Sequence, residues 1–150
     1  MIYKLLLPVA FGLLFFFSCH TGQTDAVKDT EAAVFEIHDE VMPKMGEIMK
    51  LQKQLKQRMV AIDSLAGQET PSVALRTNEE KEQAMRLNRQ LAQADSLMMD
   101  WMSNYKSDTL TALKPEQAIQ YLEAEKQKIT DVQKKTNNSI MDARQFLGLK

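Results

Sequence analysis

Sulfur, imidazole and indole side chains are concentrated in two short stretches of this chain of 150 residues. The first stretch carries His38, Met42, Met45 and Met49, whose spacings of four, three and four residues place them on one side of a helix. The second stretch carries a similar set within about one turn of helix: Met98, Met99, Trp101 and Met102. Thioether and imidazole groups are the ligands that Cu(I) prefers, and a Trp ring attracts a cation.

Three interpretations of these stretches are open: core packing, a docking surface, and a binding site for copper or haem. Methionine fills irregular gaps beside aromatic rings, so both stretches are typical of core packing next to a kinked helix. A docking surface for a partner helix or an acyl chain would use Met49, Met99 and Trp101. Haem is a further candidate, although no c-type attachment motif occurs. A copper site would use the side chains of His38, Met42, Met45, Met98 and Met102.

Catalytic motifs are not evident. The chain has two histidines, His20 and His38, and neither belongs to a zincin His-Glu-x-x-His motif or to the Glu-x-x-His pair of a di-iron bundle. A phosphate-binding glycine loop, a nucleophile elbow and a second cysteine are also missing from the sequence. Since neither a nucleophile–base pair nor a metal triad can be assembled, we expect a protein that is not an enzyme.

The N-terminus predicts export and lipidation. An apolar segment of 13 residues, 5–17, follows Lys4 and is too short to span a bilayer, which indicates a signal peptide over residues 1–18. The segment ends in Phe16-Phe17-Ser18-Cys19, which resembles a lipobox, in which the cysteine is acylated before cleavage. A plain secreted protein with an unpaired thiol is the alternative. By resemblance to bacterial sorting rules, His20 in place of Asp indicates the outer membrane, and we expect the periplasmic side.

Composition limits the mature chain to one domain and argues against nucleic acid as a partner. The whole chain has 19 basic and 20 acidic residues, and no basic stripe accompanies its few aromatic residues. We expect a flexible tether over residues 19–30 that keeps a domain over residues 31–150 close to the membrane.

Heptad spacing predicts three long helices. The first spans about residues 30–66, with buried positions every seven residues from Val34 to Ile62. Pro43 either kinks this helix or starts a new one, and the unbroken heptad phase favours a kink. The second spans about residues 77–107, with Thr77 as its N-cap. The third begins near Pro115 and ends at Gly148.

Together these elements predict an all-α fold, an elongated antiparallel three-helix bundle with coiled-coil-like packing. The alternative is that the third helix packs poorly and the other two form a dimerising hairpin. Counting equal distances from the predicted loop places Trp101 opposite Pro43, so the two methionine-rich stretches should face each other near the anchored end.

The segment from His38 to Lys50, together with Met98-Met99-Asp100-Trp101-Met102, resembles a family of small Bacteroidota lipoproteins that are often labelled "viral A-type inclusion protein". The resemblance implies a helical lipoprotein and no defined activity. We therefore expect a membrane-anchored lipoprotein of the cell envelope with a structural or protein-interaction role. It would have an envelope protein as partner and no cofactor besides the lipid on Cys19. The alternative is a periplasmic copper or haem binder.

Overall fold

The computed structural model describes residues 21–65 and 70–149, with the side chains of residues 21–23 excepted, and these residues are helical almost throughout. The predicted signal peptide, Cys19 and the proposed cap Gly67 lie outside the described residues. Five helices follow in order: α1 (Thr21–Val41), α2 (Lys44–Leu65), α3 (Pro71–Asn104), α4 (Ser107–Ala112) and α5 (Pro115–Leu147). No strand occurs among the described residues, so the predicted all-α fold is confirmed.

The first long helix of the prediction is two helices. α1 ends at Val41 and α2 begins at Lys44, with Met42 and Pro43 between them. The Met42 N–H still bonds to the His38 carbonyl at 2.9 Å, but Pro43 has no N–H to donate, so the helical ladder is interrupted there. Pro43 therefore starts a new helix, contrary to the kink that the heptad phase favours.

The heptad residues on both sides of this break are buried. The side chains of Val34, Val41, Ile48 and Leu55 are 0% exposed, and that of Ile62 is 5% exposed. The apolar stripe continues across the break because the break adds no residue to the seven-residue repeat. The sequence pattern thus predicts the buried residues correctly, although it favours a kink where the structure has a break between two helices.

α1 extends into the segment that the sequence predicts to be a flexible tether. The helix begins at Thr21, about nine residues before the predicted start. Val27 packs against the core, and the half-buried Thr30 donates its hydroxyl to the Ala26 carbonyl at 2.8 Å. These small contacts give residues 26–30 a face that packs, although the segment is polar in composition.

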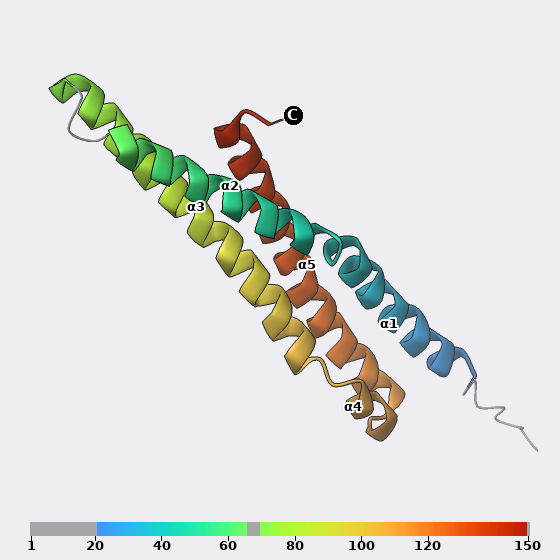
Figure 1. The fold of residues 1–150 in the computed structure, drawn as a ribbon. Helices are drawn as coiled ribbons and strands as arrows, with labels where there is room; N and C mark the ends of the chain where they lie inside the picture. The colour runs from blue at the N-terminus through green and yellow to red at the C-terminus, as the bar shows by residue number, and fades with distance from the viewer. Residues whose placement is uncertain (1–20, 66–69, 150) are drawn as a thin grey trace, which may run out of the picture.

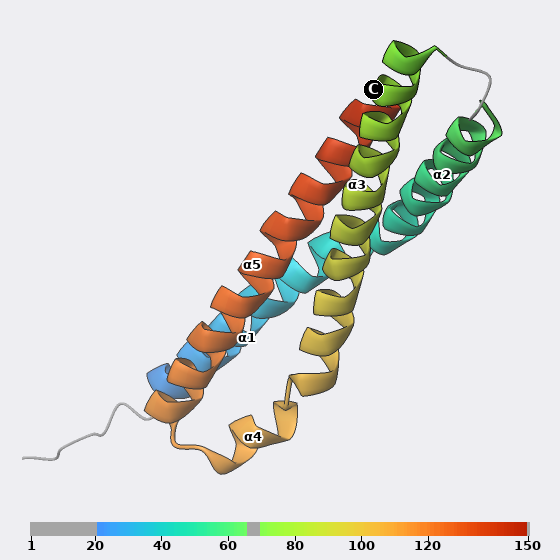
Figure 2. The ribbon, with the colours of Figure 1, turned by 90° about the vertical axis from the view of Figure 1, so that its left-hand side faces the viewer.

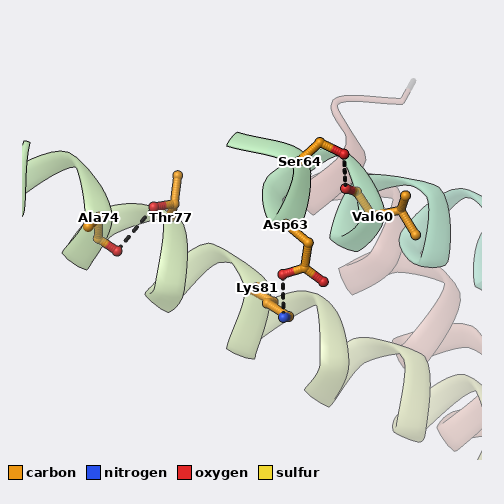
Figure 3. A network of polar contacts seen from close by, with 6 residues as sticks. All are labelled: Val60, Asp63, Ser64, Ala74, Thr77 and Lys81. Atoms are coloured by element: carbon orange, nitrogen blue, oxygen red, sulfur yellow. Dashed lines mark hydrogen bonds and ion pairs between the residues drawn. The ribbon is translucent and has the colours of Figure 1, made fainter. Parts of the chain in front are cut away.

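α3 likewise begins earlier than predicted. Thr70 is its N-cap and Pro71 occupies the first turn, where a missing N–H costs nothing. Thr77, the predicted cap, lies inside the helix and donates its hydroxyl to the Ala74 carbonyl at 3.0 Å (Figure 3). The same hydroxyl lies 2.9 Å from the Val73 carbonyl oxygen. At the other end of the chain, Gly148 has φ 68°, as its predicted role of C-cap requires.

The helices pack as an elongated antiparallel bundle (Figures 1 and 2). α1 packs mainly on α5, α2 packs mainly on α3, and α3 and α5 pack on each other. α1 and α2 run end to end and make few contacts with each other. α5 buries Leu122, Ile129 and Ala143 completely, so the alternative of a poorly packed third helix is wrong.

The α2–α3 hairpin is held together by an apolar seam with ion pairs on its flanks. Lys81 binds Asp63 across the two helices, and Ser64 beside it donates to the Val60 carbonyl at 2.9 Å (Figure 3). Arg58 Nε lies 2.5 Å from Glu80 Oε1 in the same hairpin. Exposed ion pairs of this kind contribute little stability, but they oppose a slip of one helix along the other.

Candidate functional site

His38 and Trp101 lie side by side in the structure. Their ring centroids are 5.7 Å apart with an interplanar angle of 36°. The two methionine-rich stretches therefore meet, as predicted, but Trp101 lies opposite His38 rather than opposite Pro43. The difference arises because α3 begins at Pro71, which adds nearly two turns between the loop and Trp101.

Three further rings join this pair. Phe35 packs edge-on against Tyr105, with centroids 5.3 Å apart, and Tyr105 lies 5.2 Å from Trp101 and 6.2 Å from Tyr121. We call Phe35, His38, Trp101, Tyr105 and Tyr121 the aromatic cluster. It joins α1, the end of α3 and the first turns of α5, and aromatic pairs at these distances add stability beyond their buried area.

Phe35 is the member of the aromatic cluster that sequence reasoning misses. It lies next to the buried heptad position Val34, and its side chain is 38% exposed. The signal that would have identified it is its position three residues before His38, which places both rings on neighbouring parts of the helix surface. The two rings are 6.2 Å apart.

Hydrogen bonds to the two tyrosines fix the end of α3. The Tyr105 hydroxyl donates to Glu31 Oε1 at 3.2 Å, which ties α3 to α1. The Tyr121 hydroxyl accepts a bond of 2.8 Å from the Lys106 backbone N–H, where the chain turns into α4. Burial, and then the Glu31 carboxylate, raise the pKa of Tyr105 far above its usual range, so its hydroxyl remains a donor.

A buried carboxylate lines the same groove as Trp101. Glu125 on α5 is 4% exposed, and its Oε1 accepts a bond of 2.7 Å from Lys128 Nζ. This bond raises the pKa of Lys128 above its ordinary value. Trp101, Glu125 and Lys128 line part of an open groove of about 390 Å³ between α3 and α5. The Trp101 Nε1 atom is itself buried and has no hydrogen-bond partner among the described residues.

Some of the predicted copper ligands lie in the apolar core, and the others are only partly buried. Met45 and Met98 belong to the apolar core, at 6% and 0% exposure, whereas Met42 and Met102 are partly buried against it. His38 Nδ1 lies 2.8 Å from Asp39 Oδ1. Packing therefore accounts for Met45 and Met98 without a ligand, and copper or haem binding stays a prediction. Among the described residues, no group of three His, Cys, Asp or Glu side chains is arranged to hold a metal ion.

The predicted interaction residues divide in a similar way. Met49 is 63% exposed and Met99 is 42% exposed, while Trp101 is 6% exposed. Met49 lies on the outer side of α2, away from α3, so it does not join the aromatic cluster in one surface. The structure thus separates side chains that the sequence groups together.

Comparison with known proteins gives no match to this chain, whether to protein-family models, to curated proteins or to solved structures. Within residues 21–65 and 70–149, none of the helices has both the length and the apolar character needed to cross a membrane.

Proposed function

We propose that the protein is a lipid-anchored lipoprotein of the cell envelope with a structural or protein-interaction role. The observation that carries this proposal is the placement of the chain's single cysteine, Cys19, directly after an apolar segment of 13 residues and Ser18. A lone cysteine has no disulfide partner within its own chain, so acylation gives it a role that pairing does not. The outer membrane, facing the periplasm, is the location that His20 favours.

The arrangement of the helices gives the anchored chain a long, rod-shaped surface. α1 begins two residues beyond Cys19 in the sequence, so an anchored chain enters its first helix almost at once. α1 and α2 have 21 and 22 residues, which at 1.5 Å per residue corresponds to about 31 and 33 Å. Because they run end to end, the end of α2 at Leu65 lies about 60 Å from the start of α1.

Residues on this rod that a partner could reach differ from those that hold it together. The aromatic cluster joins α1, α3 and α5 and stiffens the half of the rod that contains α1. Exposed apolar side chains such as Met49, Val60 and Leu75 lie on α2 and α3, nearer the far end. We therefore place partner binding on the outer surface of the rod rather than in the aromatic cluster.

Metabolic labelling with an alkyne-bearing palmitate tests the anchor. We expect label on the full chain expressed in a bacterium and recovery of the protein with membranes. The Cys19→Ala variant should lose the label and, because acylation precedes cleavage at a lipobox, should accumulate as a larger precursor that keeps residues 1–18. Ser18→Ala is the matched control and should keep the label. An unlabelled wild-type chain, or a Cys19→Ala variant that is still labelled, would contradict the proposal.

A further inference from the structure

The outer side of α1 is strongly acidic. α1 contains six carboxylates against one lysine, a net charge of −5 with His38 neutral. Four of them are exposed on the side away from the buried Val34 and Val41: Asp25, Asp29, Glu36 and Asp39. No ion pair within the described residues engages Asp25, Asp29 or Glu36. We call these four residues the acidic face.

The outer side of α2 has the opposite charge. α2 contains five basic residues against two carboxylates, a net charge of +3. Lys50, Lys53 and Lys56 are exposed, and no ion pair within the described residues engages them. Met49 and Val60, at 63% and 65% exposure, border the same surface, which includes a shallow groove of about 470 Å³. We call these five residues the basic face.

The two faces cannot satisfy each other within one molecule. α1 and α2 follow each other end to end. α1 packs mainly on α5 and α2 mainly on α3, and the residues of both faces are exposed. We propose that a second copy of this chain covers both faces in an antiparallel two-fold dimer. The acidic face of each copy then lies on the basic face of the other, as isologous pairing requires.

The dimensions of the two helices fit this pairing. Since α1 and α2 are about 31 and 33 Å long, an antiparallel arrangement brings α1 against the partner's α2 and α2 against its α1 at once. Two helix contacts about 30 Å long and 10 Å wide cover about 600 Å² per copy, compared with about 800 Å² per partner in a standard interface. We therefore expect a dissociation constant in the micromolar range and a strong dependence on salt.

An anionic lipid surface fits these observations less well than a second copy does. The acidic face lies closest to Cys19 in the sequence, where a negatively charged bilayer would repel it. The basic face begins 30 residues beyond Cys19, at Met49. The basic face, which anionic lipid would attract, is thus the one farther from the anchor in the sequence. The acidic face of a second copy supplies carboxylates that can pair with the lysines of the basic face.

This inference rests on the proposed interaction role and does not need the lipid anchor, so the two fail separately. Every described helix lies between residues 21 and 149, so the chain from residue 20 to 150 contains the whole described core. Sedimentation equilibrium of that chain at about 100 µM and low salt should give twice the mass of one chain. About 0.5 M NaCl should return it to the monomer.

Charge reversal gives the decisive measurement. The basic-face variant combines Lys50→Glu, Lys53→Glu and Lys56→Glu. The acidic-face variant combines Asp25→Lys, Asp29→Lys and Glu36→Lys. Each variant alone should dimerise at least about tenfold more weakly than wild type, because both contacts become repulsive. An equimolar mixture of the two should recover the dimer, because both contacts are then attractive again, and this recovery also shows that both variants are folded.

The matched control reverses three exposed carboxylates outside both faces, with Glu79→Lys, Glu82→Lys and Glu123→Lys, and should dimerise like wild type. A wild-type chain that is monomeric at about 100 µM and low salt would overturn the inference. So would face variants that dimerise like wild type, or a mixture that stays monomeric. Binding of a monomeric wild-type chain to anionic vesicles, lost in the basic-face variant, would assign the basic face to lipid instead.

Discussion

Replacing Thr136 by valine should make the bundle more stable. Thr136 lies in the middle of α5 with 0% exposure, and its hydroxyl has no hydrogen-bond partner among the described residues. A buried polar atom without a partner costs about 1–3 kcal/mol of folding free energy. Valine has the same branched shape and a similar helix propensity, so the substitution removes the hydroxyl without leaving a cavity.

The expected gain is about 1 kcal/mol in the free energy of unfolding, after a small cost for fitting a methyl group where the hydroxyl was. For a chain of this size that corresponds to a rise of about 4 °C in Tm. Urea denaturation followed by circular dichroism, with thermal melting as a second measurement, tests the value on the chain from residue 20 to 150.

Thr130→Val is the matched control for this prediction. The Thr130 hydroxyl donates to the Lys126 carbonyl at 2.7 Å and is only half-buried, so its loss should lower the free energy of unfolding by about 0.5–1 kcal/mol. The two variants change the same atoms in the same helix and should move stability in opposite directions. A destabilised Thr136→Val, or the same sign for both variants, would refute the assignment of Thr136 as an uncompensated buried hydroxyl.

Two further predictions concern backbone and pH. Gly46→Ala should raise the free energy of unfolding by about 0.5–1 kcal/mol, because a Cβ there meets nothing within 4 Å on a helical backbone. Gly148→Ala should lower it by about 1 kcal/mol, because φ 68° is strained for alanine. Equal effects in urea denaturation would contradict the two backbone assignments. For Tyr105, burial and Glu31 raise the folded pKa above the unfolded value near 10, so the unfolded chain loses this proton first and stability should fall as pH rises above about 10. Tyr105→Phe should show a shallower fall in denaturation series from pH 9 to 11, and an unchanged slope would count against the role of that hydroxyl.

Periodicity predicts the core better than it predicts the ends of the helices. The heptad positions from Val34 to Ile62 are buried as expected, because a seven-residue apolar repeat has one packing solution in a bundle. The start of α1 was less predictable, because residues 21–30 are mostly polar, although Val27 packs against the core. The Thr77 cap signal failed because Pro71 offered an earlier start, and the register of Trp101 shifted with it.

The methionine-rich stretches show how far residue types alone can define a site. His38, Met42 and Met45 share one side of a helix in the sequence pattern, but the chain breaks between Val41 and Lys44. Met45 then belongs to the core of α2, whereas His38 belongs to the aromatic cluster. The spacing of Phe35 three residues before His38 could have placed Phe35 beside His38, but its contact with Tyr105 depends on tertiary packing between helices.

The break at Met42 and Pro43 also lies between an acidic helix, α1, and a basic helix, α2. A continuous helix from α1 through α2 would carry six acidic residues in its first half and mostly basic residues in its second. The geometry of that single helix would fix the directions of the acidic and the basic face relative to each other. Two helices that contact each other little are set separately, α1 by its packing on α5 and α2 by its packing on α3. The orientation of the acidic face is therefore fixed by Val34 and Val41, and that of the basic face by Ile48 and Leu55. Restoring helical backbone at the break, by Pro43→Ala, would link these two orientations, and a change in self-association without a loss of helicity would show that the break sets the geometry of the pair.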